Sequence, residues 1–275
     1  MSEYGKFIEY GKFRFVEADS EDLKTEIYRL RHKIYVEEFR FEKPEDHPDG
    51  LETDQYEPYS IHFAALKNDD VIGTVRLVLH SVYGFPVEHA VETTFIGEKP
   101  PPERMGEISR LAVSKDFRRR KEDGRYGVES YLTKSEGGVL PDKGPRPEEF
   151  KKRKNPVIVM GLYQILYQAT KRHGLSHWYM ITEEKIYHSL KKFGFLFQQI
   201  GAPVEYHGIR IPYIGIIDDI EQKLIKENPV LLRMILRGLE RQYRPKFGIR
   251  GNLRMVMGLP HFAGKALRYW QGQRK

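Results

Sequence analysis

A carboxylate and a guanidinium stand three residues apart in a β-prone stretch at residues 105–114, as Glu107 and Arg110. In a regular strand Glu107 and Ser109 would share one face, while Arg110 would point to the other. A β-bulge re-aims the side chains that follow it, so it could bring all three polar groups toward one cleft. Taken alone, the pair also fits a surface ion pair beside an edge strand.

Two charged clusters earlier in the chain favour the interpretation that Glu107 and Arg110 line a cleft over the interpretation that they form a surface ion pair. Glu52 and Asp54 are separated by one residue, and Arg76 ends the sequence Gly-Thr-Val-Arg. Their intervals are typical of successive strands in one small sheet. Arg31 lies beside the apolar face of an expected helix, where its stem can pack while its guanidinium reaches water. We therefore expect these charged clusters to converge on one crevice.

The elements that would position these residues follow a mixed α/β order. The first helix is expected at residues 22–38 with Ser20 as its N-cap, followed by an irregular loop at 39–56. Residues 85–95 are expected to be a connector. Strands are expected at 13–16, 61–66, 71–80, 105–114, 178–182, 195–200 and 209–217, and further helices at 156–173, 183–192, 218–228 and 229–243.

Composition limits the available chemistry. The 275 residues are 40% hydrophobic and 31% charged, as in ordinary soluble proteins, and none is cysteine. This excludes a disulfide framework and a thiolate nucleophile. No helical His-x-x-x-His pair, P-loop, dinucleotide-binding glycine motif or Gly-x-Ser-x-Gly elbow occurs, so we expect no metal site. The first residues lack the apolar core of a signal peptide, and no apolar run approaches the length of a membrane span. We therefore expect a cytoplasmic location.

Positive charge is concentrated near the C-terminus. Residues 244–275 contain eight Lys or Arg and no Asp or Glu, which exceeds the net charge of +7 for the whole chain. Smaller basic clusters occupy residues 118–121 and 151–154. Such patches predict an acidic partner, which could be a carrier protein, an anionic membrane surface or nucleic acid. Solubilising surface charge would give the same pattern at any single patch.

The chain divides into an expected core domain and an extension. Residues 1–217 hold the alternating elements, interrupted at about 116–155 by a stretch rich in Pro, Gly and charge that predicts a mobile insertion. Residues 218–275 form a helical and basic extension. Its apolar helix at 229–243 could cap a hydrophobic pocket, pack against a second subunit or lie on a membrane surface.

Four motifs in order resemble the acyl-homoserine-lactone autoinducer synthases: Arg31, Glu52-x-Asp54-x-Tyr56, Gly73-x-x-Arg76-Leu77 and Glu107-x-Ser109-Arg110. A fuller run adds Phe41-Glu42, Gly50-Leu51, His62, Phe85-Pro86 and the continuation from Arg110 to Ser114. That run is similar to the N-acyl amino acid synthases associated with PEP-CTERM/exosortase systems. The likeness covers about residues 8–217.

The resemblance implies a GNAT-like fold, with a mixed, mostly antiparallel sheet flanked by helices. It also implies an N-acyltransferase that takes a long acyl group from acyl carrier protein, whose acyl-phosphopantetheine is a donor substrate, and that holds no bound cofactor. Gly124 and Gly127 depart from the glycine loop that binds CoA pyrophosphate, which argues against free CoA. Glu57 replaces the usual Asp, and Phe39 and Phe41 occupy the region of an expected Trp. Both departures favour an ordinary amino acid over S-adenosylmethionine as acceptor.

Residue roles follow from this resemblance. Glu107, beside Ser109, would be the base that takes the amine proton, and His62 is the rival base or a structural residue. Arg76 and Arg110 would hold the acceptor's carboxylate or buttress Glu52 and Asp54, and Arg31 would pair with one of those acids. The acyl chain would lie along Leu162, Ile165, Leu166 and Trp178, unless these are plain core. The carrier protein would meet Arg118, Arg119, Arg120, Lys121, Lys151 and Lys152.

Three alternatives stay open. One is a homoserine-lactone synthase that consumes S-adenosylmethionine. Another is a basic nucleic-acid-binding module, although few aromatic residues accompany the basic tail and no nucleic acid is expected. The last is a peripheral contact of residues 229–275 with the inner membrane face, which is compatible with the acyltransferase because its products would carry lipid tails.

Overall fold

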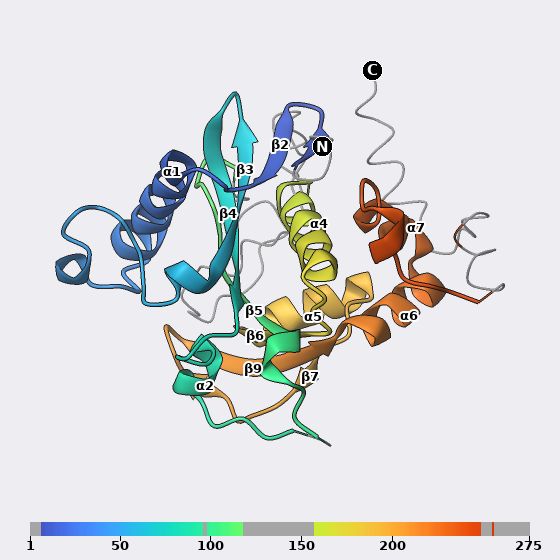
Figure 1. Ribbon diagram of the computed structural model, residues 1–275. Coiled ribbons are helices and arrows are strands. Elements are labelled where there is room, and N and C mark those ends of the chain that lie inside the picture. The colour runs from blue at the N-terminus through green and yellow to red at the C-terminus, as the bar shows by residue number, and fades with distance from the viewer. Residues whose placement is uncertain (1–6, 96–97, 118–156, 249–254, 256–275) are drawn as a thin grey trace, which may run out of the picture.

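The computed structural model of the chain describes residues 7–95, 98–117, 157–248 and 255, and it shows a strongly twisted sheet between helices (Figure 1). The order of the strands is β1-β2-β3-β4-β5-β6-β9-β7, and β8 pairs with β9. All pairs are antiparallel except β5–β6. This confirms the expected mixed, mostly antiparallel sheet. The strands are β1 Phe7–Tyr10, β2 Phe13–Glu17, β3 Ser60–Lys67, β4 Asp70–Leu79, β5 Met105–Val113, β6 His177–Thr182, β7 Gln198–Gln199, β8 Val204–Glu205 and β9 Ile209–Ile216.

Helices cover both faces of this sheet. The α-helices are α1 Glu21–Arg31, α2 Pro86–Ala90, α4 Val157–Arg172, α5 Glu184–Phe193, α6 Ile217–Glu227 and α7 Pro229–Ile235. A π-helix, His32–Glu38, continues α1, and short 3₁₀ turns occur at Pro44–Asp46, Glu57–Tyr59, Pro102–Arg104 and Arg241–Tyr243. Figure 1 shows α1 and α4 on opposite sides of β3 and β4. Ser20 caps α1 as predicted, since its Oγ accepts from the Leu23 N–H at 3.2 Å.

Alternation along the central strands assigns polar and apolar side chains to different faces. On β3, Phe63 and Ala65 join the main core on the α4 side, whereas Ala64 and Leu66 pack with Ile27 of α1. His62 therefore faces α1, together with its cross-strand partner Arg76 on β4. The side chains that β3 and β4 turn toward α4 are apolar, so their chemistry-bearing residues collect beneath α1.

Several boundaries differ from the sequence expectation. The apolar stretch at 229–243 is α-helical only to Ile235, because the chain turns at Gly238, whose φ is 89°. The expected strand at 195–200 contracts to two residues, and Phe195 and Phe197 insert into the core instead. The strands β1 and β8 and the short helix α2 were not expected. The expected insertion lies almost wholly outside the described residues.

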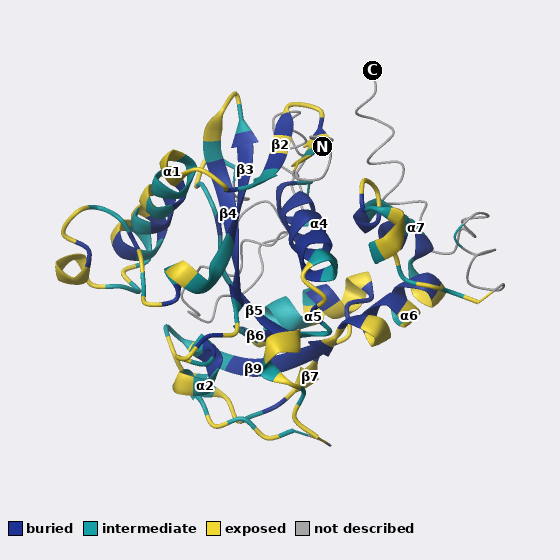
Figure 2. Cartoon of the chain, viewed as in Figure 1, coloured by how far each residue is buried: buried dark blue, intermediate teal, exposed yellow. Residues whose placement is uncertain are grey.

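The described start of the C-terminal extension packs into the main core. Leu224, Leu232 and Ile235 are fully or almost fully buried in the same cluster as Leu162 of α4 (Figure 2). Gln168 of α4 is also buried and donates to the carbonyl oxygens of Ile235 and Arg237. The apolar side chains of α7 therefore face the protein's own interior. No helix of the described part is long and apolar enough to cross a membrane.

Gly161 allows α4 to approach the sheet closely. A Cβ at this position would lie 2.4 to 2.6 Å from ring atoms of Phe15, which is fully buried on β2. We expect Gly161→Ala to lower the free energy of unfolding by about 1–3 kcal/mol through overpacking. Denaturant unfolding measures this, with Gly248→Ala as the control because a Cβ there meets open space. Equal effects of the two substitutions would contradict the packing argument.

Candidate functional site

One row of polar residues crosses three neighbouring strands beneath α1. His62 on β3 is the register partner of Arg76 on β4, and Arg76 is the partner of Ser109 on β5. The three side chains therefore share one face, because directly opposed residues in a sheet point the same way. His62 and Arg76 are each only 1% exposed. The row forms the floor of a polar network that is closed from above by α1 and the loop after it.

A β-bulge adds Arg110 to this face. The pairing of β4 with β5 shifts between Thr74, opposite Ala112, and Arg76, opposite Ser109, so β5 has one extra residue there. Arg110 occupies the bulge with φ of 51°, in the left-handed region that non-glycine residues seldom adopt. Strict alternation would turn Arg110 away from Ser109. The bulge instead brings its guanidinium to Glu52 and Asp54.

Arg76 is held from several sides. Its Nη1 and Nη2 donate to the two carboxylate oxygens of Asp54 at 2.7 and 2.9 Å, in a bidentate pair. Its Nη1 also lies 2.9 Å from Glu57 Oε1, and its Nε donates to Ser109 Oγ at 3.0 Å. All the donor nitrogens of this guanidinium are thus engaged within the protein.

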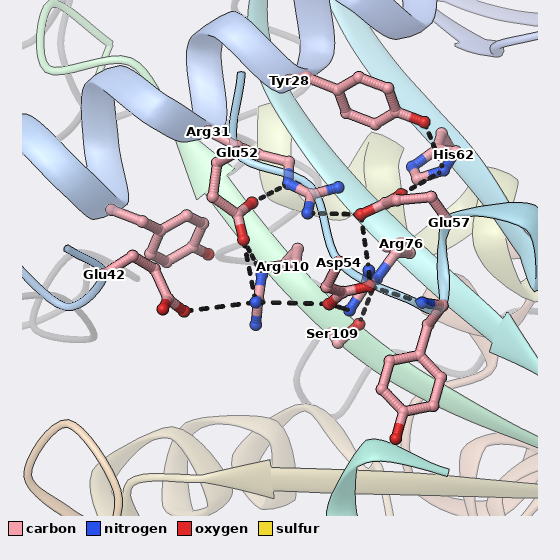
Figure 3. A network of polar contacts seen from close by, with 12 residues as sticks. Tyr28, Arg31, Glu42, Glu52, Asp54, Glu57, His62, Arg76, Ser109 and Arg110 are labelled. Atoms are coloured by element: carbon pink, nitrogen blue, oxygen red, sulfur yellow. Dashed lines mark hydrogen bonds and ion pairs between the residues drawn. The ribbon is translucent and has the colours of Figure 1, made fainter. Parts of the chain in front are cut away.

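Arg31 and Arg110 share the Glu52 carboxylate. Arg31 Nε donates to Glu52 Oε2, and Arg31 Nη2 donates to Glu57 Oε1 at 2.8 Å. Arg110 Nε donates to Glu52 Oε1 at 2.9 Å. Figure 3 shows these contacts as one continuous chain from Glu42, through the three arginines, to His62.

Glu57 links the halves of this network, a role that the sequence did not reveal. One of its oxygens contacts Arg31 and Arg76, and the other lies 3.0 Å from His62 Nε2. Glu57 stands close after Asp54 in the sequence, but its spacing alone does not mark it as a partner of Arg31 and Arg76. The 3₁₀ turn at Glu57–Tyr59 was not recognised, and this turn is what carries the carboxylate back over β3.

Charge pairing sets the ionisation of the acids. Burial alone would raise the pKa of Glu52, but the Arg110 and Arg31 charges outweigh it and hold that pKa at about 2. For Glu57, burial is likewise outweighed by His62, Arg31 and Arg76, which keep its pKa well below the usual range. Burial lowers the pKa of His62 against the opposing pull of Glu57. Near neutral pH the acids are ionised and His62 is uncharged.

Glu107 lies on the same face but has a different environment. Its side chain is 1% exposed, and its Oε2 accepts a hydrogen bond from the Val87 N–H at 2.8 Å. Burial raises the pKa of Glu107 to about 8, although Val87, Arg76 and Arg110 pull it down. A carboxyl group with such a pKa can exchange a proton near physiological pH. The contact with Val87 at the start of α2 was not expected from the sequence.

Glu107 stands where two strands part. Among the described strands, β5 pairs with the parallel strand β6 only through Met105, Gly106 and Glu107. Beyond this point β5 runs on to Val113, whereas β6 runs on to Thr182 paired with β9. On the β6 side, the backbone N–H and C=O groups of β5 after Glu107 therefore have no strand partner in the described sheet. They can instead form hydrogen bonds with a ligand.

The sequence-derived residues fall into three groups in space. Those brought together in the network or next to it are Arg31, Glu52, Asp54, His62, Arg76, Glu107, Ser109 and Arg110. Those named for the acyl chain, Leu162, Ile165, Leu166 and Trp178, are packed in the main core. Those named for the carrier protein, Arg118, Arg119, Arg120, Lys121, Lys151 and Lys152, lie outside the described residues.

Other neighbours of the network were missed because they belong to the helix and loop above it. Tyr35 donates to the carbonyl oxygen of Leu111 in the bulge at 3.0 Å, and the ring of Tyr28 meets that of His62 edge to face. Glu42 lies 3.4 Å from Arg110 Nη2. Within the described residues, no group of three or more His, Asp or Glu side chains could hold a metal ion.

Comparisons with known proteins agree with this architecture. Residues 30–123 match the family model of the acetyltransferase (GNAT) domain. The chain is similar to a CoA-dependent acyl-homoserine lactone synthase, BjaI, with MTA, at 18% identity over 85% of this chain and 92% of that one, with a TM-score of 0.51. It is also similar to TofI in a ternary complex with an inhibitor and MTA, at 16% identity over 80% and 99% of the two chains, with a TM-score of 0.50.

A further solved structure, the N-acyl amino acid synthase FeeM from uncultured soil microbes, matches at 10% identity over 77% of this chain and 94% of that one, with a TM-score of 0.44. No curated protein sequence matches the chain. The fold assignment rests on the first two structures and on the family model. The chain therefore has the GNAT acyltransferase fold, which it shares with the acyl-homoserine lactone synthases.

Proposed function

We propose that the protein is an N-acyltransferase that moves a long acyl group from acyl carrier protein to the amine of an amino acid. The observation that carries this proposal is Glu107, a buried carboxyl group whose pKa is raised to about 8, at the point where β5 and β6 separate. The GNAT fold supports acyl transfer in general. The suspected link to exosortase systems belongs to the same proposal.

The reaction needs a proton acceptor and a site for negative charge. The acceptor's ammonium group loses a proton to the Glu107 carboxylate, directly or through water, and its nitrogen attacks the thioester carbonyl carbon. Backbone N–H groups of β5 beyond Glu107 stabilise the oxyanion of the tetrahedral intermediate. The nitrogen of the tetrahedral intermediate then loses its second proton. As the C–S bond breaks, that proton passes to the departing thiolate, which leaves a neutral amide and a free thiol, and Glu107 releases its own proton to solvent.

The remaining residues position the reactants. His62 is buried against Glu57, which supports a positioning role for it rather than a role as the base. Arg76 is fully engaged with Asp54, Glu57 and Ser109, which supports the buttressing role. Arg110 is 18% exposed at its side chain and can also reach the acceptor's carboxylate. The carrier protein would dock on the basic clusters at 118–121 and 151–152.

Turnover by the purified full chain tests the proposal. We expect an N-acyl amino acid, identified by mass spectrometry, and one free thiol for each amide formed when acyl carrier protein is the donor. Acyl-CoA as donor and S-adenosylmethionine as acceptor are run in parallel. Faster transfer from acyl-CoA would overturn the donor assignment, and formation of a homoserine lactone would replace the acceptor assignment. Thiol release that does not depend on any amine would reject N-acyl transfer.

A further inference from the structure

The exposed edge of the polar network is acidic, whereas the buried arginines at its centre are paired with carboxylates. Arg31 and Arg76 are 0% and 1% exposed at their side chains, and each is held by two carboxylates. Glu42 and Asp54 are exposed by 26% and 24%, so they face solvent more than the partly exposed Arg110 does. Among the described residues, the network joins four carboxylates to three guanidinium groups, so its side chains carry one more negative than positive charge.

Glu42 is the carboxylate of this exposed edge with the most capacity for another partner. Its contacts are long, 3.4 Å to Arg110 Nη2 and 3.8 Å to His207 Nε2. Asp54, in contrast, makes the bidentate pair with Arg76 and also accepts from the Tyr56 N–H at 2.9 Å. Burial lowers the pKa of His207, so this ring adds no positive charge near neutral pH. An incoming cation would therefore improve the pairing of Glu42.

An aromatic wall stands beside Glu42. The rings of Phe39 and Phe41 stack at 5.3 Å, and Phe41 stacks on His207 of the β8–β9 turn at 5.0 Å. This stack joins the loop after α1 to the far end of the sheet. Apolar ring surface next to a partly exposed carboxylate suits a ligand group that has a methylene stem and a cationic end.

We propose that Glu42 determines acceptor specificity by binding a second positive charge on the acceptor, so that the preferred acceptor is a basic amino acid. This inference rests on the proposed N-acyltransferase function. The side-chain cation lies at Glu42, its methylene stem lies against Phe41, and the exposed edge of Arg110 meets the α-carboxylate. The reacting amine then extends toward Glu107.

An acceptor panel tests this charge preference with acyl carrier protein as donor. Lysine and ornithine are compared with leucine and norleucine, which have similar length and no side-chain charge, and with glutamate. Putrescine and S-adenosylmethionine are included as cations of other classes. We expect the highest kcat/KM with the basic amino acids and a smaller preference at high salt, where charge attraction is screened. Equal or better use of leucine, or a better rate with putrescine or S-adenosylmethionine, would overturn the proposal.

Glu42→Gln isolates the carboxylate, and Glu45→Gln, an exposed acid of the same loop, is the matched control. We expect Glu42→Gln to raise KM for lysine by about two- to fivefold relative to its effect on KM for leucine, as for a partly exposed ion pair. Glu45→Gln should change none of these values. Equal changes for lysine and leucine would overturn the inference and leave N-acyl transfer intact. If no amine in the panel is acylated, it is the proposed function that fails.

Discussion

Glu107→Gln is expected to reduce kcat by about a hundredfold or more, which is the typical contribution of a positioned general base. The amide keeps an oxygen that can accept from the Val87 N–H, so the local structure should survive. What it loses is the capacity to take a proton from the attacking amine. Steady-state kinetics with saturating acceptor measure the loss, and Glu103→Gln, an exposed acid close by in the sequence, is the control. A rate within a few-fold of wild type would remove Glu107 from the role of base.

The pH profile gives an independent signature of the same carboxyl group. The base form of Glu107 predominates only above its raised pKa of about 8, so wild-type kcat should rise as the pH passes through about 8 and level off above that range. The residual rate of Glu107→Gln should lack this step. A step that persists in the variant would belong to another group, such as the acceptor's own amine.

Stability should show the opposite trend. Because burial raises the pKa of Glu107 from 4.5 to about 8, the folded state holds a proton that the unfolded state has lost between those values. The stability contributed by the protonated form is complete below about pH 4.5 and is lost as the pH rises through about 8. Glu107→Gln should remove this part of the pH dependence, which denaturant unfolding at several pH values can measure.

The bulge at Arg110 shows how far sequence reasoning reaches at this site. Alternation correctly places Glu107 with Ser109, and the β-bulge considered for this strand is present, but the sequence does not show which residue occupies the bulge. The left-handed backbone of Arg110 follows from tertiary contacts, because the guanidinium is held by Glu52 and the bulge carbonyl of Leu111 by Tyr35. The expected strands place these residues in one sheet. Which face each residue takes depends on the register of β3, β4 and β5 and on the contacts that the loop after α1 makes with them.

Loops account for most of what was not predicted. Glu42, Glu57 and Val87 come from segments without hydrophobic periodicity, whose paths depend on long-range contacts. Long elements were predicted well because their burial pattern is repeated over many residues, as in the strand and helix that carry Arg76 and Leu162. The extra edge strands β1 and β8 have few residues, so they provide too short a pattern to be recognised.

Arg31→Met is expected to lower the free energy of unfolding by about 3 kcal/mol or more, because it leaves buried carboxylates without one of their partners. Arg31 is fully buried and contacts Glu52, also fully buried, and Glu57. Arg29→Met is the matched control on the same helix. Arg29 is more than half exposed and pairs with Glu26, so its loss should cost well under 1 kcal/mol. Similar losses for both variants would show that the buried network does not stabilise the fold.

Acid unfolding separates the charge effect from lost packing. The stability that Glu52 contributes is present above about pH 4.5 and is lost as the pH falls toward its lowered pKa of about 2. Without Arg31, one of the two charges that lower this pKa is missing, so the acid transition should begin at a higher pH. Arg31→Lys keeps the positive charge but not the planar guanidinium with its several donors, so its acid transition should begin at a pH between those of wild type and Arg31→Met. A double-mutant cycle of Arg31→Met with Glu52→Gln then measures their coupling, since contacting members of one network are not additive.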